Sequence, residues 1–307
     1  MKKTVSLITL VLFISLSVSA LQAQNSGDAP KKHRYLDQEG LLMNFETRAN
    51  DIYQSGNFLS FEDATKQLEE TEGKKVEIKR VAPNENILEK SEIFSLLEES
   101  FVAYGIAFDC GNCDRAHVSP SSGYVIDEDG LIVTNHHVVQ SFTKGKSGDK
   151  NLTMQIMTTS GKVYPVVEIV SASKGYDLAI VRVDTNGDKL TPIPFGEDAN
   201  VGDDVYVLSN PQGMLFYFSS GVVSRNYLLR NNPHDFKAAT PEMQITAEYA
   251  VGSSGAPIVN NRGNLVSTVS TTNSVYSNND QRTGSLQMVA RGTKPVVLLR
   301  EMVKFVD

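Results

Sequence analysis

A serine flanked by glycines stands in the segment Gly252–Pro257, which reads GSSGAP. A serine hydroxyl is a poor nucleophile until a base takes its proton, and the oxyanion formed by its attack needs hydrogen-bond donors. Gly252 permits the backbone dihedrals that turn two amides toward one point, and Gly255 lets a substrate approach closely. The N–H groups of Gly252 and Ser254 would then form an oxyanion hole. A glycine-serine turn without chemistry fits the same pattern about as often.

Two further segments could supply the base and a partner for it. His137 follows an apolar run within TNHHVV at 134–139, and a histidine at a strand end can act as a general base. Asp177 begins the run DLAIV at 177–181, where its carboxylate could hold the imidazole tautomer and stabilise the imidazolium. Considered alone, the histidine fits a structural or metal-binding role equally well, and the aspartate is more often a strand-start residue.

The order of these three residues is histidine, aspartate, serine, with gaps of 40 (177 minus 137) and 77 (254 minus 177). This is the order of the chymotrypsin-type barrels, and it differs from that of subtilisins and α/β-hydrolases. The chain resembles a trypsin-like serine protease, in particular the bacterial HtrA/Deg type and its single-domain relatives. The resemblance implies peptide-bond hydrolysis through an acyl-enzyme, with His137, Asp177 and Ser254 as the catalytic residues.

Other segments extend this resemblance over about 92–307. They lead to the family's histidine or form its middle hairpin, and they read SGYVID at 122–127, GLIVTN at 130–135, VGD at 201–203, SNPQG at 209–213 and SGVVS at 220–224. In the family pattern the histidine directly precedes an aliphatic pair, which selects His137 over His136. The nucleophile follows a glycine by two positions, which selects Ser254 over Ser253.

The sequence also departs from the family pattern. The chain ends at Asp307 with no PDZ domain, so we do not expect the oligomer-gated behaviour of many HtrA relatives. Ser253 stands where the digestive members carry an aspartate, which argues against activation through a freshly cut N-terminus. Ala256 replaces the usual second glycine, a change that we interpret as tolerated.

Glu248 and Tyr249 should lie near the pocket for the side chain that precedes the cut. By trypsin-like logic Glu248 could attract lysine or arginine, whereas a medium apolar preference is the default for HtrA relatives. Glutamyl specificity is not expected, because such relatives use a pocket histidine after the serine and no histidine follows His234.

Cys110, Cys113 and His117 form a C-x2-C-x3-H cluster that could supply three ligands to zinc. No fourth ligand is obvious, and in an exported protein a C-x-x-C pair more often forms a disulfide. We therefore expect a small disulfide loop, no metal and no cofactor. A reactive dithiol is the remaining alternative.

The first residues resemble a secretory signal peptide. Lys2 and Lys3 precede an apolar run over 5–18, and small residues follow at Ser19, Ala20 and Ala23. The run is shorter than the roughly 20 residues of a membrane-spanning helix. We expect a signal peptide at 1–23, a partly helical extension at 24–90 and a protease domain at 91–307. The protein would be periplasmic or secreted, without a membrane span.

From residue 101 onward, short apolar or alternating runs recur between turn signals, which is typical of all-β folds. Together with the resemblance, they predict two packed six-stranded antiparallel β-barrels. A C-terminal helix from Thr293 to about Phe305 and an N-terminal helical extension complete the expected fold. The predicted strands lie near 101–108, 123–126, 131–134, 152–157, 163–170, 178–184, 204–208, 216–223, 243–248, 257–260, 265–270 and 285–290. Polar surface loops are expected at 142–151, 226–242 and 273–284.

The formal net charge of −7 argues against nucleic acid as a partner, because phosphate binding requires a basic face. Protein or peptide substrates are the expected partners, and the sequence does not indicate an oligomeric state. An inactive relative that binds peptides or partner proteins is the alternative. The presence of all three catalytic residue types argues against that alternative.

Overall fold

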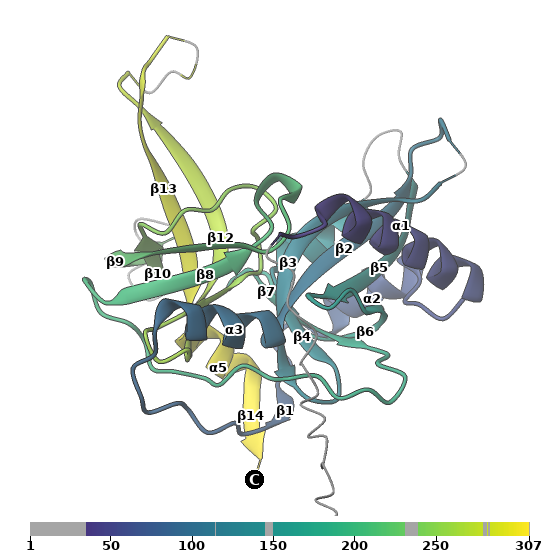
Figure 1. Cartoon of the computed structure of the whole chain (residues 1–307), viewed down its shortest axis with the longest axis horizontal. Helices are drawn as coiled ribbons and strands as arrows, with labels where there is room; N and C mark the ends of the chain where they lie inside the picture. The colour runs from purple at the N-terminus through teal and green to yellow at the C-terminus, as the bar shows by residue number, and fades with distance from the viewer. Residues whose placement is uncertain are drawn as a thin grey trace, which may run out of the picture. The chain divides into compact units, whose positions relative to one another are not determined.

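Two closed six-stranded antiparallel β-barrels form the body of the computed structural model, so the predicted fold is confirmed (Figure 1). The structure describes residues 35–113, 115–144, 150–230, 239–278, 281 and 283–306. The predicted signal peptide at 1–23 lies outside the described residues. Closure into barrels pairs the strand edges that an open sheet would leave exposed.

The first barrel has the strand order β2-β3-β4-β7-β6-β5. Its strands are β2 (Phe101–Asp109), β3 (His117–Asp127), β4 (Leu131–Thr134), β5 (Lys150–Thr158), β6 (Val163–Ser173) and β7 (Leu178–Val183). The second barrel has the order β10-β13-β12-β11-β8-β9. It contains β8 (Asp204–Ser209), β9 (Tyr217–Arg230), β10 (Ala239–Ile245), β11 (Pro257–Val259), β12 (Leu265–Tyr276) and β13 (Leu286–Pro295). All twelve predicted strands are present.

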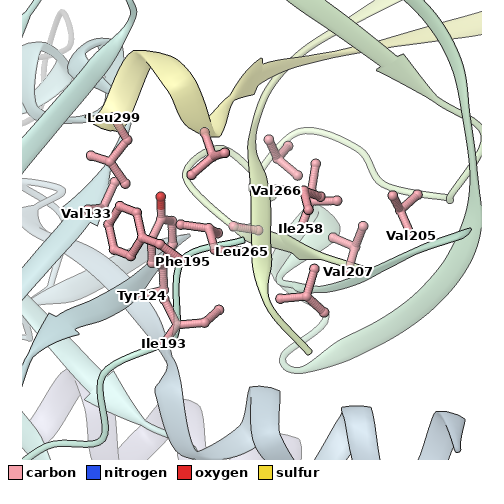
Figure 2. Close-up of a cluster of buried hydrophobic side chains, with 14 of the residues drawn as sticks. Tyr124, Val133, Ile193, Phe195, Val205, Val207, Ile258, Leu265, Val266 and Leu299 are labelled. Atoms are coloured by element: carbon pink, nitrogen blue, oxygen red, sulfur yellow. The ribbon is translucent and has the colours of Figure 1, made fainter. Parts of the chain in front are cut away.

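A buried cluster joins the two barrels, and Figure 2 shows part of it. Tyr124 and Val133 come from the first barrel, whereas Val207 and Leu265 come from the second. The hydroxyl of Tyr124 also lies 2.7 Å from Oγ1 of Thr268 on β12. This shared core fixes the junction at which side chains from both barrels meet.

Two helices that precede the barrels in the chain, α1 and α2, pack on the first barrel. Helix α1 (Gln38–Ser55) buries Phe45 and Ala49. Helix α2 (Phe61–Glu70) is capped by Ser60, whose side chain accepts a hydrogen bond from the Asp63 amide. The remaining helices are α3 (Lys90–Ser100), α4 (His136–Lys144), the 3-10 turn η1 (Pro211–Gly213) and α5 (Val296–Met302). Among the described helices, none is both long and apolar enough to cross a bilayer.

Some predicted boundaries were wrong. The C-terminal helix is shorter than predicted, because β13 pairs with β12 as far as Pro295, and β14 (Val303–Val306) forms a parallel pair with β1 (Val76–Lys79).

Parts of the three expected surface loops are regular structure. Helix α4 extends to Lys144, β9 extends to Arg230, β10 begins at Ala239 and β12 extends to Tyr276. The polar residues there belong to exposed strand extensions, whose backbone hydrogen bonds are made within hairpins. Polarity alone therefore did not distinguish a loop from the solvent-exposed end of a hairpin.

Candidate active site

His137, Asp177 and Ser254 lie side by side at the junction of the two barrels. His137 is in the first turn of α4, Asp177 immediately precedes β7, and Ser254 is in the loop before β11. Nε2 of His137 is 2.9 Å from Oγ of Ser254, and Nδ1 is 2.9 Å from Oδ2 of Asp177. The imidazole therefore bridges a hydroxyl from one barrel and a carboxylate from the other.

The carboxylate of Asp177 is held by several donors. The backbone N–H of His137 donates to Oδ1 at 3.1 Å, and the hydroxyl of Ser270 donates to Oδ2 at 2.7 Å. The side-chain amide of Asn135 donates to the Asp177 carbonyl at 2.8 Å, where Asp177 has a φ of 53°. Aspartate is among the few residue types that adopt this left-handed conformation readily. These bonds fix both the backbone and the side chain of Asp177.

Asp177 remains ionised at neutral pH. Burial alone would raise the pKa of its carboxyl group, but hydrogen bonds and charge from His137, with the hydrogen bond from Ser270, lower the pKa below its ordinary value overall. His136 differs from its neighbour, because its side chain is buried and this burial lowers the pKa of the imidazole. A neutral, buried ring is consistent with a structural role for His136.

The loop around Ser254 requires glycine at two positions. Gly252 has a φ of +96°, and a Cβ there would lie 2.5 Å from the carbonyl oxygen of Asn210. Gly255 has a φ of +85°, and a Cβ there would lie 2.3 Å from the carbonyl oxygen of Ser122. Any side chain at either position would therefore displace backbone that belongs to a neighbouring segment.

Two backbone amides of this loop, unlike their neighbours, donate no hydrogen bond among the described residues. The N–H groups of Ser253, Gly255 and Ala256 each donate to a backbone carbonyl at 3.0 Å. Those of Gly252 and Ser254 donate to no acceptor among the described residues. Ser253 is fully buried and its hydroxyl donates to Oγ of Ser209 at 3.1 Å. Its hydroxyl therefore faces the protein interior, whereas the hydroxyl of Ser254 faces His137.

Ser122 on β3 holds the same loop from the first barrel, a role that sequence reasoning missed. Its hydroxyl donates to the Gly252 carbonyl at 3.1 Å, and its N–H donates to the Ser254 carbonyl at 3.0 Å. The N–H of Asn210 in turn donates to Oγ of Ser122 at 3.2 Å. Ser122 stands in the recognised segment at 122–127, but nothing in the sequence relates it to residue 252.

A pocket beside the loop contains both residues that were expected near the substrate side chain. Glu248 forms an ion pair with Arg291, whose guanidinium also donates to the Tyr249 carbonyl at 3.3 Å. The side chain of Arg291 is 13% exposed, and that of Glu248 is 66% exposed. The hydroxyl of Tyr249 donates to the Gly292 carbonyl at 2.8 Å, and this hydrogen bond fixes the position of the tyrosine ring in the pocket lining. Other lining residues are Pro211, Gln212, Met214, Tyr217, Ala250, Val251, Thr272, Ser274 and Val289.

A second pocket is lined in part by Ser254 and is mainly apolar. The hairpin β2–β3 forms one wall, and Val138 of α4 forms another. The lining residues are Ile106, Phe108, Ser119, Pro120, Ser121, Val138, Ser141, Asn151, Val251, Gly252 and Ser254. Ser254 lines this second pocket, and Val251 lines both pockets.

The cysteine cluster lies away from this site, at the tip of the β2–β3 hairpin. Cys110 and Cys113 are free thiols with their sulfurs 3.5 Å apart, so the expected disulfide is not formed in the structure. Nε2 of His117 is 3.1 Å from Sγ of Cys113. The structure thus brings the three residues together but not in the expected covalent form.

The two-barrel architecture is a chymotrypsin-like fold. Residues 121–267 match the family model described as a trypsin-like peptidase domain. The resemblance predicted from the sequence is thereby confirmed for this part of the chain.

Relatives named as serine proteases match about half of the chain. Protease Do-like 1, chloroplastic, of Arabidopsis thaliana is 31% identical over 150 residues, which cover 47% of this chain and 31% of the relative. The probable periplasmic serine endoprotease DegP-like of Chlamydia trachomatis is 30% identical over 150 residues, covering 47% of this chain and 27% of the relative. The putative serine protease HhoA of Synechocystis is 27% identical over 170 residues, covering 53% and 39%. In each case the match covers less than half of the relative's own length.

Proposed function

We propose that this chain is an exported serine endopeptidase that hydrolyses peptide bonds in protein or peptide substrates. The observation that carries the proposal is the 2.9 Å distance between Nε2 of His137 and Oγ of Ser254. The ionised Asp177 and the two free amides beside Ser254 are the other groups that acyl transfer requires. The names of the relatives support the activity, and the pattern of residues 1–23 supports export.

In the proposed reaction, Nε2 of His137 takes the hydroxyl proton while Oγ of Ser254 attacks the substrate carbonyl carbon. The N–H groups of Gly252 and Ser254 donate hydrogen bonds to the oxyanion. The imidazolium then gives its proton to the leaving amine, and the C–N bond breaks to leave an acyl group on Ser254. Water, deprotonated by the same imidazole, releases the acid. Throughout, Asp177 holds the tautomer and stabilises the positive ring.

The domain organisation forms part of the proposal. Residues 91–307 would be the protease domain and residues 24–90 an extension, whose helices α1 and α2 pack on the first barrel. Phe45 of α1 supports this attachment, because a Cβ on Gly105 of β2 would lie 2.5 Å from the phenylalanine ring. Such close packing is expected of a segment that folds with the barrel.

The side-chain pocket does not favour basic substrates. Because Glu248 already has Arg291 as its cationic partner, a lysine or arginine side chain would have to displace that partner. We therefore propose a preference for uncharged side chains before the cut. Arg291→Gln should free the carboxylate and raise cleavage after lysine and arginine at least tenfold relative to the wild type, as measured with a peptide library.

The double substitution Glu248→Gln with Arg291→Gln is the matched control for this pocket. It should not show the increased cleavage after lysine and arginine, because the carboxylate is absent. Strong lysine or arginine preference in the wild-type protein would contradict the proposal. An unchanged profile in the single variant would contradict it as well.

Digestion of unfolded casein by the purified chain tests the activity itself. Ser254→Ala should reduce kcat/KM by about 10⁵-fold or more, because the nucleophile is lost. Ser253→Ala, a change in the adjacent serine, should retain activity within about one order of magnitude. Labelling by a fluorophosphonate should follow the same pattern. A folded wild-type protein that neither cleaves casein nor labels would instead indicate a peptide-binding relative without activity.

A further inference from the structure

The tip of the β2–β3 hairpin gathers three side chains that ligate metals. Cys110 and Cys113 lie in the connecting loop, and His117 is the first residue of β3. One ligand atom from each lies within 4.8 Å of the other two. No other cysteine, histidine or acidic residue in the described part of the chain joins this group.

The separations between these atoms suit a tetrahedral cation. Zinc binds thiolates at about 2.3 Å and imidazole nitrogens at about 2.0 Å, so tetrahedral angles separate two sulfurs by about 3.8 Å and a sulfur from a nitrogen by about 3.5 Å. The two sulfurs are 3.5 Å apart, and Sγ of Cys113 is 3.1 Å from Nε2 of His117. Small rotations of the side chains would open these distances around a metal ion.

A carboxylate stands behind the histidine. Oε1 of Glu46 on α1 is 3.5 Å from Nδ1 of His117, the ring nitrogen that faces away from the sulfurs. Metal-bound histidines commonly donate their other N–H to such a carboxylate, which fixes the tautomer and strengthens the ligand. A hydrogen bond from Nδ1 of His117 to Glu46 would leave Nε2 unprotonated toward Sγ of Cys113.

We propose that Sγ of Cys110, Sγ of Cys113 and Nε2 of His117 bind a thiophilic divalent cation, with Zn²⁺ preferred. Binding displaces the two thiol protons to solvent, so the neutral histidine and two thiolates neutralise the charge of the ion. The fourth coordination position is left to water. This inference replaces the disulfide that the sequence suggested for an exported protein.

Metal binding at this tip would also order the wall of the apolar pocket beside Ser254. The ring of His117 packs against that of Phe108, with centroids 5.6 Å apart, and Phe108 lines that pocket. Through Glu46 the same ion would join the hairpin to α1. We therefore expect the cation to raise the thermal stability of the chain.

Cobalt and zinc binding by the reduced chain tests the proposal directly. The full chain with Ser254→Ala, which prevents self-digestion, is purified under reducing conditions and freed of metal. We expect one equivalent of Co²⁺ to give thiolate-to-metal charge-transfer absorption, and one equivalent of Zn²⁺ to abolish it and raise the melting temperature. Absence of both binding signals would overturn the proposal. A two-proton mass deficit and no bound metal in the unreduced exported chain would also overturn it, because the cysteines would then form a disulfide.

Substitutions locate the ligands. Cys113→Ser and His117→Gln should weaken binding at least 100-fold, and Glu46→Gln should weaken it by about 10- to 100-fold. Asn50→Ala, on the next turn of α1 and in the same surface pocket as Glu46, is the matched control and should bind normally. Undiminished cobalt absorption in Cys113→Ser would refute the assignment. The binding of Co²⁺ and Zn²⁺ by the chain that keeps Cys110, Cys113 and His117 decides the question even if a ligand variant fails to fold.

Discussion

The junction of the barrels and the tip of the β2–β3 hairpin share one arrangement. In each, a histidine ring lies between a carboxylate and a nucleophilic atom. At the junction, Nε2 of His137 is 2.9 Å from Oγ of Ser254 and Nδ1 is 2.9 Å from Asp177. At the tip, Nε2 of His117 is 3.1 Å from Sγ of Cys113, and Nδ1 is 3.5 Å from Glu46.

The two sites differ in the residues that surround the nucleophilic atom. On the loop of Ser254 two amides have no acceptor among the described residues, and Ser254 lines a pocket, so the proposed reaction would bind a substrate carbonyl group there. Cys113 has a second thiol at 3.5 Å, which creates a point where three soft or borderline ligands converge. An acid–histidine–nucleophile arrangement therefore does not define a function by itself. The groups beside the nucleophilic atom, backbone amides in one case and a second thiol in the other, determine which chemistry is available.

The largest expected contrast between the two regions comes from amide substitution of each carboxylate. Asp177→Asn should lower kcat by about 10⁴-fold, because an amide at this position stabilises the wrong imidazole tautomer. Glu46→Gln, the equivalent change at the tip, should leave kcat within about threefold while it weakens cation binding. Steady-state kinetics on one peptide substrate measures both variants. Comparable losses of kcat would show that the two regions are not chemically separate.

The sequence predicted the fold because the strands carry local signals. Alternating or fully apolar runs bounded by glycine, asparagine and aspartate marked all twelve strands, although β3, β9, β12 and β13 extend five to seven residues beyond the predicted ends. The pairing of β1 with β14 had no such signal. Its register joins Val76 to Val303, and short strands that pair across most of the chain length cannot be distinguished locally from loop or helix ends.

Residue type and chain order pointed to His137, Asp177 and Ser254, whereas the residues that position them were missed. Ser122 and Ser270 are serines within strands, and only the fold brings them to Gly252 and Asp177. Arg291 was missed for a similar reason. It lies 43 residues from Glu248, and the ion pair depends on β13 returning beside the loop that precedes Ser254. Long-range polar contacts of this kind leave no pattern in sequence.

The smallest expected effect concerns the hydroxyl that supports Asp177. Ser270→Ala removes a donor that lowers the pKa of the Asp177 carboxyl group, so this pKa should rise in the variant. A hydrogen bond to a charged group contributes about 1.5 kcal/mol, which predicts a loss of kcat/KM of about tenfold or less.

The loss of unfolding free energy in Ser270→Ala should depend on pH. A lowered folded-state pKa stabilises the protein above the ordinary aspartate value of about 3.9, and this contribution is lost as pH falls through the folded-state pKa. The difference between wild type and variant should therefore be constant near neutral pH and shrink in acid, as measured by urea unfolding. Ser267→Ala is the matched control, because its hydroxyl donates to the neutral hydroxyl of Thr293 at 2.7 Å, so its cost should not vary with pH. If both serine variants showed the same pH-independent loss, Ser270 would act at the junction as a packing residue and not through the charge of Asp177.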